Sequence, residues 1–190
     1  MSQAHRRGRL VVIAGPSGVG KSSLVARMLQ LCPRLWFSVS ATTRSRRPGE
    51  VEGRDYHFVD AAEFDRMIAA GELLEWADIH GGTHRSGTPR DPVQRRLAEG
   101  LPVLVEVDLQ GARAIRTALP EARAVFIAPP SWDDLVHRLV GRGTEAPEII
   151  ERRLQTAKEE LAASDEFDMV VVNDDVQRAA EQLLDLVIDR

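Results

Sequence analysis

The segment Gly15–Ser22 constrains the fold of this chain more than any other. It reads Gly-Pro-Ser-Gly-Val-Gly-Lys-Ser and matches the pattern GxxxxGK[ST]. An apolar run, Leu10–Ala14, precedes it and an amphipathic run, Lys21–Leu31, follows it, which predicts a strand, a loop and a helix in that order. Glycines let such a loop turn its N–H groups toward phosphate oxygens, and the helix N-terminus adds a positive partial charge. The sequence therefore predicts a phosphate-binding loop.

This loop predicts a site for ATP. Lys21 is expected to reach the β- and γ-phosphates, and the Ser22 hydroxyl to bind Mg²⁺. Lysine at position 21 gives modest support, because only two of the 25 basic residues, Lys21 and Lys158, are lysines. The expected contacts with ATP are Ala14, Gly15, Pro16, Ser17, Gly18, Val19, Gly20, Lys21, Ser22 and Ser23.

Short apolar runs alternate with amphipathic ones over most of the remaining chain. This alternation predicts an α/β fold, in which a parallel sheet is covered by helices on both faces. The expected strands are Leu10–Ala14, Val103–Val107, Ala124–Ala128 and Met169–Val172; the expected helices are Lys21–Leu31, Leu109–Leu119, Ser131–Val140 and Val176–Ile188.

Two segments interrupt this alternation. Residues 38–100 mix strands with short helices and predict an inserted α+β subdomain, with strands at Ser38–Thr42, Tyr56–Val59 and Leu74–Ile79. Residues 141–147 are charged and flanked by glycines, which predicts a small lid. The core is then 10–37 and 101–190, preceded by a disordered lead-in at 1–9.

Composition excludes several classes of protein. A net charge of −4 argues against a general nucleic-acid binder. The apolar runs are too short to span a membrane, and the polar N-terminus is no secretory signal. A single cysteine, Cys32, allows no intrachain disulfide and suits the cytosol. The sequence leaves monomer and homo-oligomer open.

The chain resembles guanylate kinases over nearly its whole length. The resemblance implies a P-loop NTPase-type core, an inserted GMP-binding subdomain and a lid, and transfer of the γ-phosphoryl group of MgATP to GMP, and to dGMP. The stretches that carry it, in family order, are Gly15–Ser22, Phe37–Arg44, Arg47–Glu50, Gly53–Tyr56, Glu75–Ala77, Glu106–Gly111, Pro129–Ser131, Arg138–Leu139 with Gly141–Gly143, and Val172–Asp175.

The same resemblance assigns Arg44, Arg47 and Tyr56 to the phosphate of GMP. Arginine suits this role because its planar fork donates two hydrogen bonds to one phosphate. Without the resemblance, residues 44–47 would be interpreted as a solvated basic loop.

For the guanine base, the resemblance implies Glu75, with Ser40 as a further contact. Guanine presents N1–H and N2–H₂ as adjacent donors, and a carboxylate accepts both. The alternative for Glu75 is an exposed glutamate beside an inward-packing Trp76.

One stretch departs from the family pattern, which has paired aromatics soon after this glutamate. Residues 81–88 carry two extra positions instead. Aligning Gly87-Thr88 with the family places Thr88 in the GMP site and Ser86 at the phosphate-binding tyrosine. Aligning from Gly81 places His84 there, and Arg85 is a further substitute. We prefer Ser86, since that register brings Glu106 and Asp108 into place.

The resemblance places Arg138, Arg142 and Arg153 around the transferred phosphate, with Lys21 and with Arg44 from the acceptor side. Arg138 also has Asp134 at i−4, which predicts an ordinary ion pair as the alternative. Asp108 is expected to meet Mg²⁺, directly or through water, and to lie in the GMP site with Glu106. Whether Glu106 serves the nucleoside or Mg²⁺ stays open.

Two other functions compete with this prediction. One is a kinase for a different nucleoside monophosphate, against which Glu75 and Ser40 argue. The other is a guanylate-kinase-like module that binds protein partners without catalysis, against which the intact loop and the lid arginines argue.

Overall fold

A central parallel sheet organises the molecule. The computed structural model describes residues 7–79, 82–140 and 147–188. Strand β1 (Leu10–Ala14) lies in the middle of a five-stranded sheet of order β2-β7-β1-β8-β9. The flanking strands are β2 (Trp36–Phe37), β7 (Val103–Glu106), β8 (Arg123–Ala128) and β9 (Met169–Val172), and each paired neighbour runs parallel.

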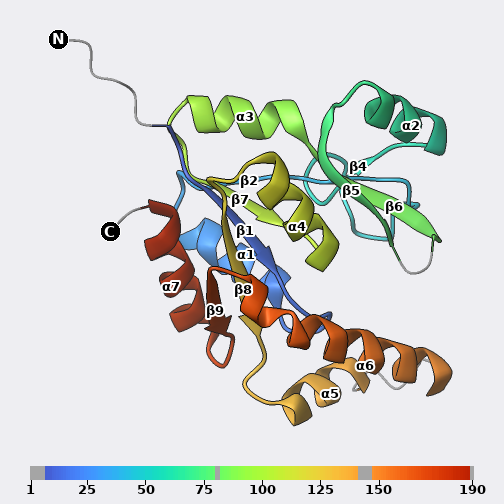
Figure 1. Ribbon diagram of the computed structural model, residues 1–190, viewed down its shortest axis with the longest axis vertical. Helices are drawn as coiled ribbons and strands as arrows, with labels where there is room; N and C mark the ends of the chain where they lie inside the picture. The colour runs from blue at the N-terminus through green and yellow to red at the C-terminus, as the bar shows by residue number, and fades with distance from the viewer. Residues whose placement is uncertain (1–6, 80–81, 141–146, 189–190) are drawn as a thin grey trace.

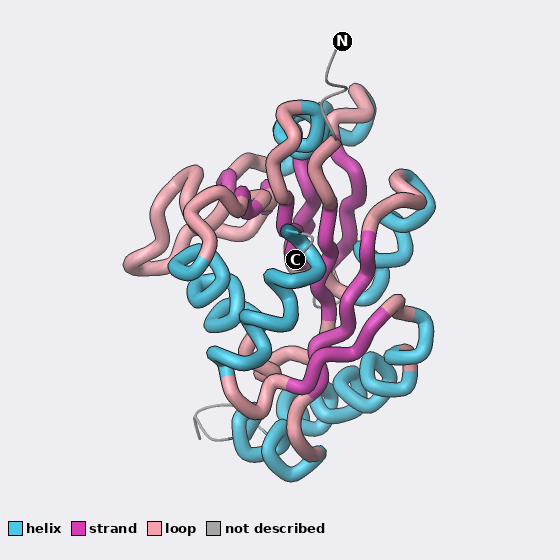
Figure 2. The backbone as a smooth tube through the Cα atoms, turned by 90° about the vertical axis from the view of Figure 1, so that its left-hand side faces the viewer, coloured by secondary structure: helices cyan, strands magenta, loops and turns pink. Residues whose placement is uncertain are grey.

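Helices cover both faces of this sheet, as the sequence predicts (Figures 1 and 2). Successive side chains of a strand point to opposite faces of the sheet, so alternate residues of β1 pack against the helices on each face. Val11 and Ile13 pack with α1 (Lys21–Leu31) and α7 (Val176–Ile188). Leu10 and Val12 pack with α3 (Arg90–Ala98) and α4 (Leu109–Ala118).

The segment 38–100 forms a second sheet of order β4-β3-β6-β5. Its strands are β3 (Ala41–Thr42), β4 (His57–Phe58), β5 (Leu73–Ile79) and β6 (His84–Pro89), and α2 (Ala61–Ala69) packs on it through Phe64. Strand β5 has two sides. Leu73 joins the small cluster of Ala41 and Phe64, whereas Leu74 joins the core cluster of Leu10 and Val12.

Strand β6 is a strand that the sequence analysis does not predict. Residues 84–86 are polar and lack the alternation of a half-buried strand. The strand forms because antiparallel partners lie on both sides, β5 and β3. The expected strand Ser38–Thr42 is likewise shortened to β3.

The structure describes only part of the expected lid and of the expected lead-in. Residues 141–146 of the lid, which include Arg142, and residues 1–6 of the lead-in lie outside the described residues. Pro147, the last residue of the expected lid, begins α6 (Pro147–Ala162), and this helix packs beside α5 (Trp132–Val140). In the described part of the lead-in, the Gly8 N–H donates to the Leu97 carbonyl at 2.7 Å. Among the described residues, no helix combines the length and the apolar character needed to cross a membrane.

The phosphate-binding loop is pressed against the backbone of β8. Gly15 has φ 152°, and a Cβ built on it would lie 2.3 Å from the Ile127 carbonyl oxygen. Residues other than glycine rarely adopt this backbone conformation, and the space between Gly15 and the Ile127 carbonyl is too small for any side chain. Glycine at position 15 is therefore required by packing as well as by backbone geometry.

Gly15→Ala should lower the free energy of unfolding by more than Gly49→Ala does. Gly49 has φ 88° and a Cβ built on it would meet nothing within 4 Å, so its substitution meets only backbone strain of about 1–2 kcal/mol. Gly15→Ala must also move a carbonyl, which adds roughly 1–3 kcal/mol. Urea denaturation measures both; equal losses would contradict the packing argument.

Candidate active site

The carbonyl of Val19 holds the phosphate-binding loop to the rest of the core. It accepts hydrogen bonds from Asn173 Nδ2 at 2.8 Å and from Arg138 Nη1 at 3.2 Å. Lys21 Nζ turns back over the loop and donates to the Gly15 and Pro16 carbonyls at 2.7 and 3.3 Å. The loop before α1 is thus fixed from β9, from α5 and by its own lysine.

Two expected arginines reach this loop. Arg138 contacts Val19, and Arg153 Nη2 donates to the Ser17 hydroxyl at 3.3 Å. The alternative ion pair with Asp134 is not what the structure has. The Asp134 carboxylate accepts from the Ser131 hydroxyl at 2.6 Å, and Ser131 caps α5 by accepting from the Asp134 N–H at 3.1 Å. Lys21, Arg138 and Arg153 therefore bring three positive charges to one loop.

Two acidic residues lie at the carboxyl end of β7. Glu106 is half-buried; desolvation raises the pKa of its carboxyl, and the charge of Lys21 opposes this rise. Asp108 caps α4, where its Oδ1 accepts from the Gly111 N–H at 2.7 Å. Among the described residues, no three acidic, histidine or cysteine side chains gather as a metal cluster.

Glu75 is the most unusual carboxylate of the inserted sheet. Glu75 is 7% exposed, whereas its neighbour Trp76 is 44% exposed. The alternative of an exposed Glu75 beside an inward-packing Trp76 is therefore wrong for both residues. Its Oε1 accepts from the Thr88 hydroxyl at 2.6 Å. Burial, with a smaller contribution from Asp108, raises the pKa of Glu75 to about 7.

Glu75 also lies against the start of α4. A Cβ built on Gly111 would be 3.0 Å from Glu75 Oε2 and 3.2 Å from Asp108 Oδ1. Glycine at 111 therefore leaves room for a carboxylate of the inserted sheet beside one of the core. The carboxylates of Glu75 and Asp108, one from each subdomain, therefore both lie beside Gly111.

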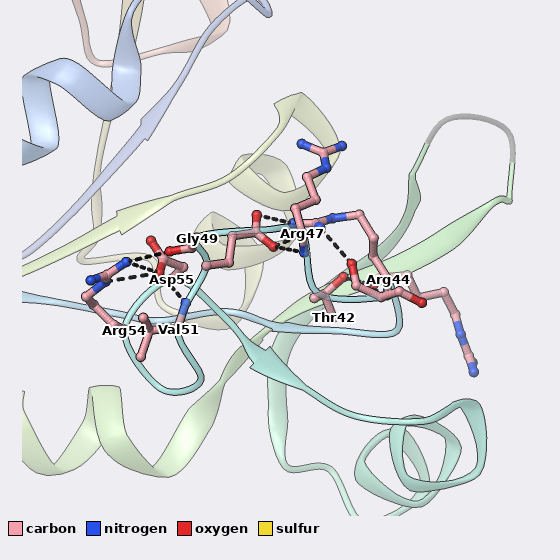
Figure 3. A network of polar contacts seen from close by, with 10 residues as sticks. Thr42, Arg44, Arg47, Gly49, Val51, Arg54 and Asp55 are labelled. Atoms are coloured by element: carbon pink, nitrogen blue, oxygen red, sulfur yellow. Dashed lines mark hydrogen bonds and ion pairs between the residues drawn. The ribbon is translucent and has the colours of Figure 1, made fainter.

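Arg44 is fixed by a residue that sequence reasoning gave no role. Its guanidinium donates twice to Glu50, at 2.8 and 3.0 Å, and lies 5.1 Å from the centre of the Tyr56 ring. Hydrogen bonds from Arg44 and from the Arg47 N–H lower the pKa of Glu50 to about 2. Figure 3 shows this loop, with the neighbouring network of Arg54 and Asp55.

The other expected acceptor residues differ in their surroundings. Arg47 is exposed and Ser40 is half-buried. Of the three candidates for the missing aromatic, Ser86 donates to the Ala41 carbonyl at 3.2 Å. Arg85 pairs with Asp65 and lies over the Phe64 ring, away from Arg44. His84, at the start of β6, is half-buried.

Comparison with known proteins decides the family. The guanylate kinase family model matches residues 7–190. The chain belongs to the guanylate kinase family. Similar curated proteins include the guanylate kinases of Nocardia farcinica, 64% identical over 99% of this chain and 97% of that protein, and Rhodococcus jostii, 63% identical over 98% and 90%. A guanylate kinase structure from Anaplasma phagocytophilum has a TM-score of 0.78 and 30% identity, covering 96% of this chain and 85% of that one.

Sequence reasoning missed Glu50 and Asn173 as supporting residues of this guanylate kinase site. Both lie in stretches that match the family, but their contacts depend on the fold. Asn173 is 2% exposed, and an asparagine directly after the apolar run Met169–Val172 is a signal that it is buried with a partner. Glu50 had no such signal, since a glutamate after glycine in a basic loop is ordinarily solvated.

The stability of the protein should depend on pH through Glu75. Its folded-state pKa of about 7 exceeds the ordinary 4.5, so its contribution is complete below about pH 4.5 and is lost as pH rises to about 7. Relative to Glu75→Gln, the wild-type free energy of unfolding should fall across this window by up to about 3 kcal/mol. Urea titrations at several pH values measure the difference. Glu99→Gln, an exposed change at the C-cap of α3, is the control and should keep the pH dependence of wild type; a Glu75→Gln curve that did so too would refute the assignment.

Proposed function

We propose that this chain transfers the γ-phosphoryl group of MgATP to GMP, giving ADP and GDP. The observation that carries the proposal is the buried carboxylate of Glu75, which accepts from Thr88 and lies beside Gly111 and Asp108 at the start of α4. Membership of the guanylate kinase family supports the same reaction. ATP and GMP are then its small-molecule substrates, and the lone Cys32 supports a cytosolic protein.

The donor nucleotide is held by residues 14–23. Backbone N–H groups of this loop and the N-terminus of α1 favour anions. Lys21 already lies over the loop, and a small rotation of its flexible stem turns Nζ from the Gly15 carbonyl to a phosphate. The Ser22 hydroxyl and Asp108 are the proposed Mg²⁺ ligands, with Mg²⁺ neutralising phosphate charge when bound. They fit Mg²⁺, which takes few protein ligands and keeps phosphates and waters.

The acceptor is held by the inserted sheet. Arg44, Arg47 and Tyr56 bind the phosphate of GMP, and the ion pair with Glu50 fixes the direction of the Arg44 fork. A guanidinium has five N–H donors, so donors remain for the phosphate. Glu75 accepts from N1–H and N2–H₂ of guanine, with Ser40, Ser86, Thr88, Glu106 and Asp108 completing the site.

Transfer depends on positioning and on charge rather than on a strong base. Lys21, Arg138 and Arg153 converge on the loop. Arg44 is proposed to approach the transferred group from the acceptor side. These charges stabilise the negative charge that spreads over the transferred group. Arg142, outside the described residues, is proposed as a further member of this set.

The direct test is ADP formation from MgATP with each of GMP, dGMP, AMP, CMP and UMP. ADP should form rapidly with GMP and be lost in Lys21→Ala, while Lys158→Ala, the other lysine, keeps activity. None of the proposed contacts reads the ribose 2′-hydroxyl, so dGMP should also be an acceptor. Turnover only with another monophosphate would overturn the acceptor, and GMP binding without turnover would favour a protein-binding module.

Glu75→Gln should reduce kcat/KM for GMP while leaving the affinity for ATP within twofold. The glutamine side chain places its NH₂ donor against an N–H donor of guanine. The variant therefore loses one good bidentate contact, worth about 1–3 kcal/mol, or roughly 5- to 150-fold. Steady-state kinetics with GMP and equilibrium binding of ATP measure the two effects. Equal losses for both nucleotides would contradict the role of Glu75 in reading the base.

A further inference from the structure

Gly111 is a glycine inside a helix whose backbone does not require one. It is the third residue of α4 and is buried, and its φ lies outside the left-handed range that favours glycine. Glycine weakens a helix relative to alanine, because it loses more backbone freedom on folding. The reason for glycine at this position therefore lies in what surrounds the missing side chain.

Three neighbours close the space around Gly111. A Cβ built on it would lie 2.9 Å from Val107 Cβ, 3.0 Å from Glu75 Oε2 and 3.2 Å from Asp108 Oδ1. Val107 and Asp108 directly precede α4, and Asp108 is fixed there as the N-cap by the hydrogen bond from the Gly111 N–H. Glu75 alone comes from the inserted sheet, on strand β5, which packs against α4 (Figure 1). Gly111 is thus a point at which the core touches the carboxylate of the inserted sheet.

The Glu75 carboxylate has little room to retreat from a methyl group at position 111. Its other oxygen, Oε1, accepts from the Thr88 hydroxyl at 2.6 Å, and Glu75 and Thr88 are 7% and 0% exposed. A distance of 3.0 Å is well inside the roughly 3.5–4.0 Å at which non-bonded atoms pack best. Alanine at 111 would therefore turn the carboxylate about its hydrogen bond with Thr88, or push β5 away from α4.

The recognition of guanine is sensitive to such a turn. A carboxylate accepts from both N1–H and N2–H₂ only when its two oxygens lie close to the plane of these donors. An oxygen that already accepts one hydrogen bond can accept a second, so the contact with Thr88 leaves Oε1 able to bind the base. A displaced carboxylate can still meet one of the two donors, but it cannot meet both.

We propose that Gly111 is a positioning residue that determines acceptor specificity: because it carries no side chain, the Glu75 carboxylate can take the orientation that accepts from both donors of guanine. This inference rests on the proposed function, in which Glu75 reads the base. It assigns part of acceptor recognition to a helix of the core, in addition to the inserted sheet.

Gly111→Ala should lower kcat/KM for GMP by roughly tenfold to a hundredfold, mainly through a higher KM. The preference for GMP over inosine monophosphate should fall with it, since inosine monophosphate has N1–H but no N2–H₂ and gains less from an aligned carboxylate. Thr117→Ala is the matched control, because it also puts alanine in place of a weaker helix former on α4, at an exposed position. It should keep both wild-type values.

Steady-state kinetics with the two acceptors, at saturating MgATP, measure these effects. Equal losses of kcat/KM for GMP and for inosine monophosphate would mean that alanine only disturbs the fold, and would overturn the proposal. If Gly111→Ala alone does not fold, the double variant with Glu75→Asp should fold, because the shorter side chain withdraws its carboxylate from the added methyl group. A double variant that is equally unfolded would also overturn the proposal.

A double-mutant cycle in urea tests the contact without any nucleotide. Alanine at 111 meets Val107 and Asp108 whatever residue stands at 75, but it meets Oε2 only when Glu75 is present. The free energy of unfolding that Gly111→Ala removes should therefore be smaller in a Glu75→Ala background than in wild type. Equal losses in the two backgrounds would contradict the contact.

The two measurements separate this inference from the proposed function. If wild type does not phosphorylate GMP, the proposed reaction is wrong, and the urea cycle alone decides whether Gly111 positions Glu75. If wild type phosphorylates GMP and Gly111→Ala keeps the wild-type preference for GMP over inosine monophosphate, the reaction stands and the role of Gly111 in specificity is wrong.

Discussion

The contact between Gly15 and the backbone of β8 sets the position of the phosphate-binding loop. A backbone carbonyl cannot move without breaking the parallel ladder that β8 makes with β1 and β9. The start of the loop is therefore fixed by its contact with the sheet. The hydrogen bonds from Asn173 and Arg138 to the Val19 carbonyl fix the end of the loop that leads into α1. Cations that reach the loop from α1, α5 and α6 are placed relative to this fixed frame, which is what a site that stabilises phosphate charge needs.

Buried charge is the second organising principle. Glu75 is buried, Glu106 and Glu160 are half-buried, and desolvation raises the pKa of each. The charge of Asp108 adds to the rise in the pKa of both Glu75 and Glu160. Glu75 belongs to the inserted sheet and Glu160 to a helix of the core, so the negative charge of Asp108 acts on carboxylates of both subdomains.

The sequence predicts the core well for a physical reason. Short runs rich in valine and other apolar residues, such as Val103–Val105, favour a buried parallel strand over other arrangements. The bounds expected for the helices between them differ from the observed ones by at most one residue at either end. Strand β6 escapes prediction because its pairing with β5 and β3, rather than its own residues, makes it a strand. The roles of Glu50 and Asn173 escape for the same reason: each contact joins groups that only the fold brings together. The expected roles of Arg47, Ser40 and Ser86 toward GMP remain predictions.

The two sides of β5 have a thermodynamic consequence. Leu73 belongs to the small hydrophobic cluster of the inserted sheet, and Leu74 belongs to the main core. A cluster of three buried residues is too small to hold a folded unit on its own, since small domains bury too little apolar surface. The inserted sheet is therefore stabilised by the packing of β5 against the main core, through Leu74. Heat or denaturant should therefore melt the molecule in a single cooperative transition, with the acceptor subdomain never surviving the loss of the sheet that carries the phosphate-binding loop.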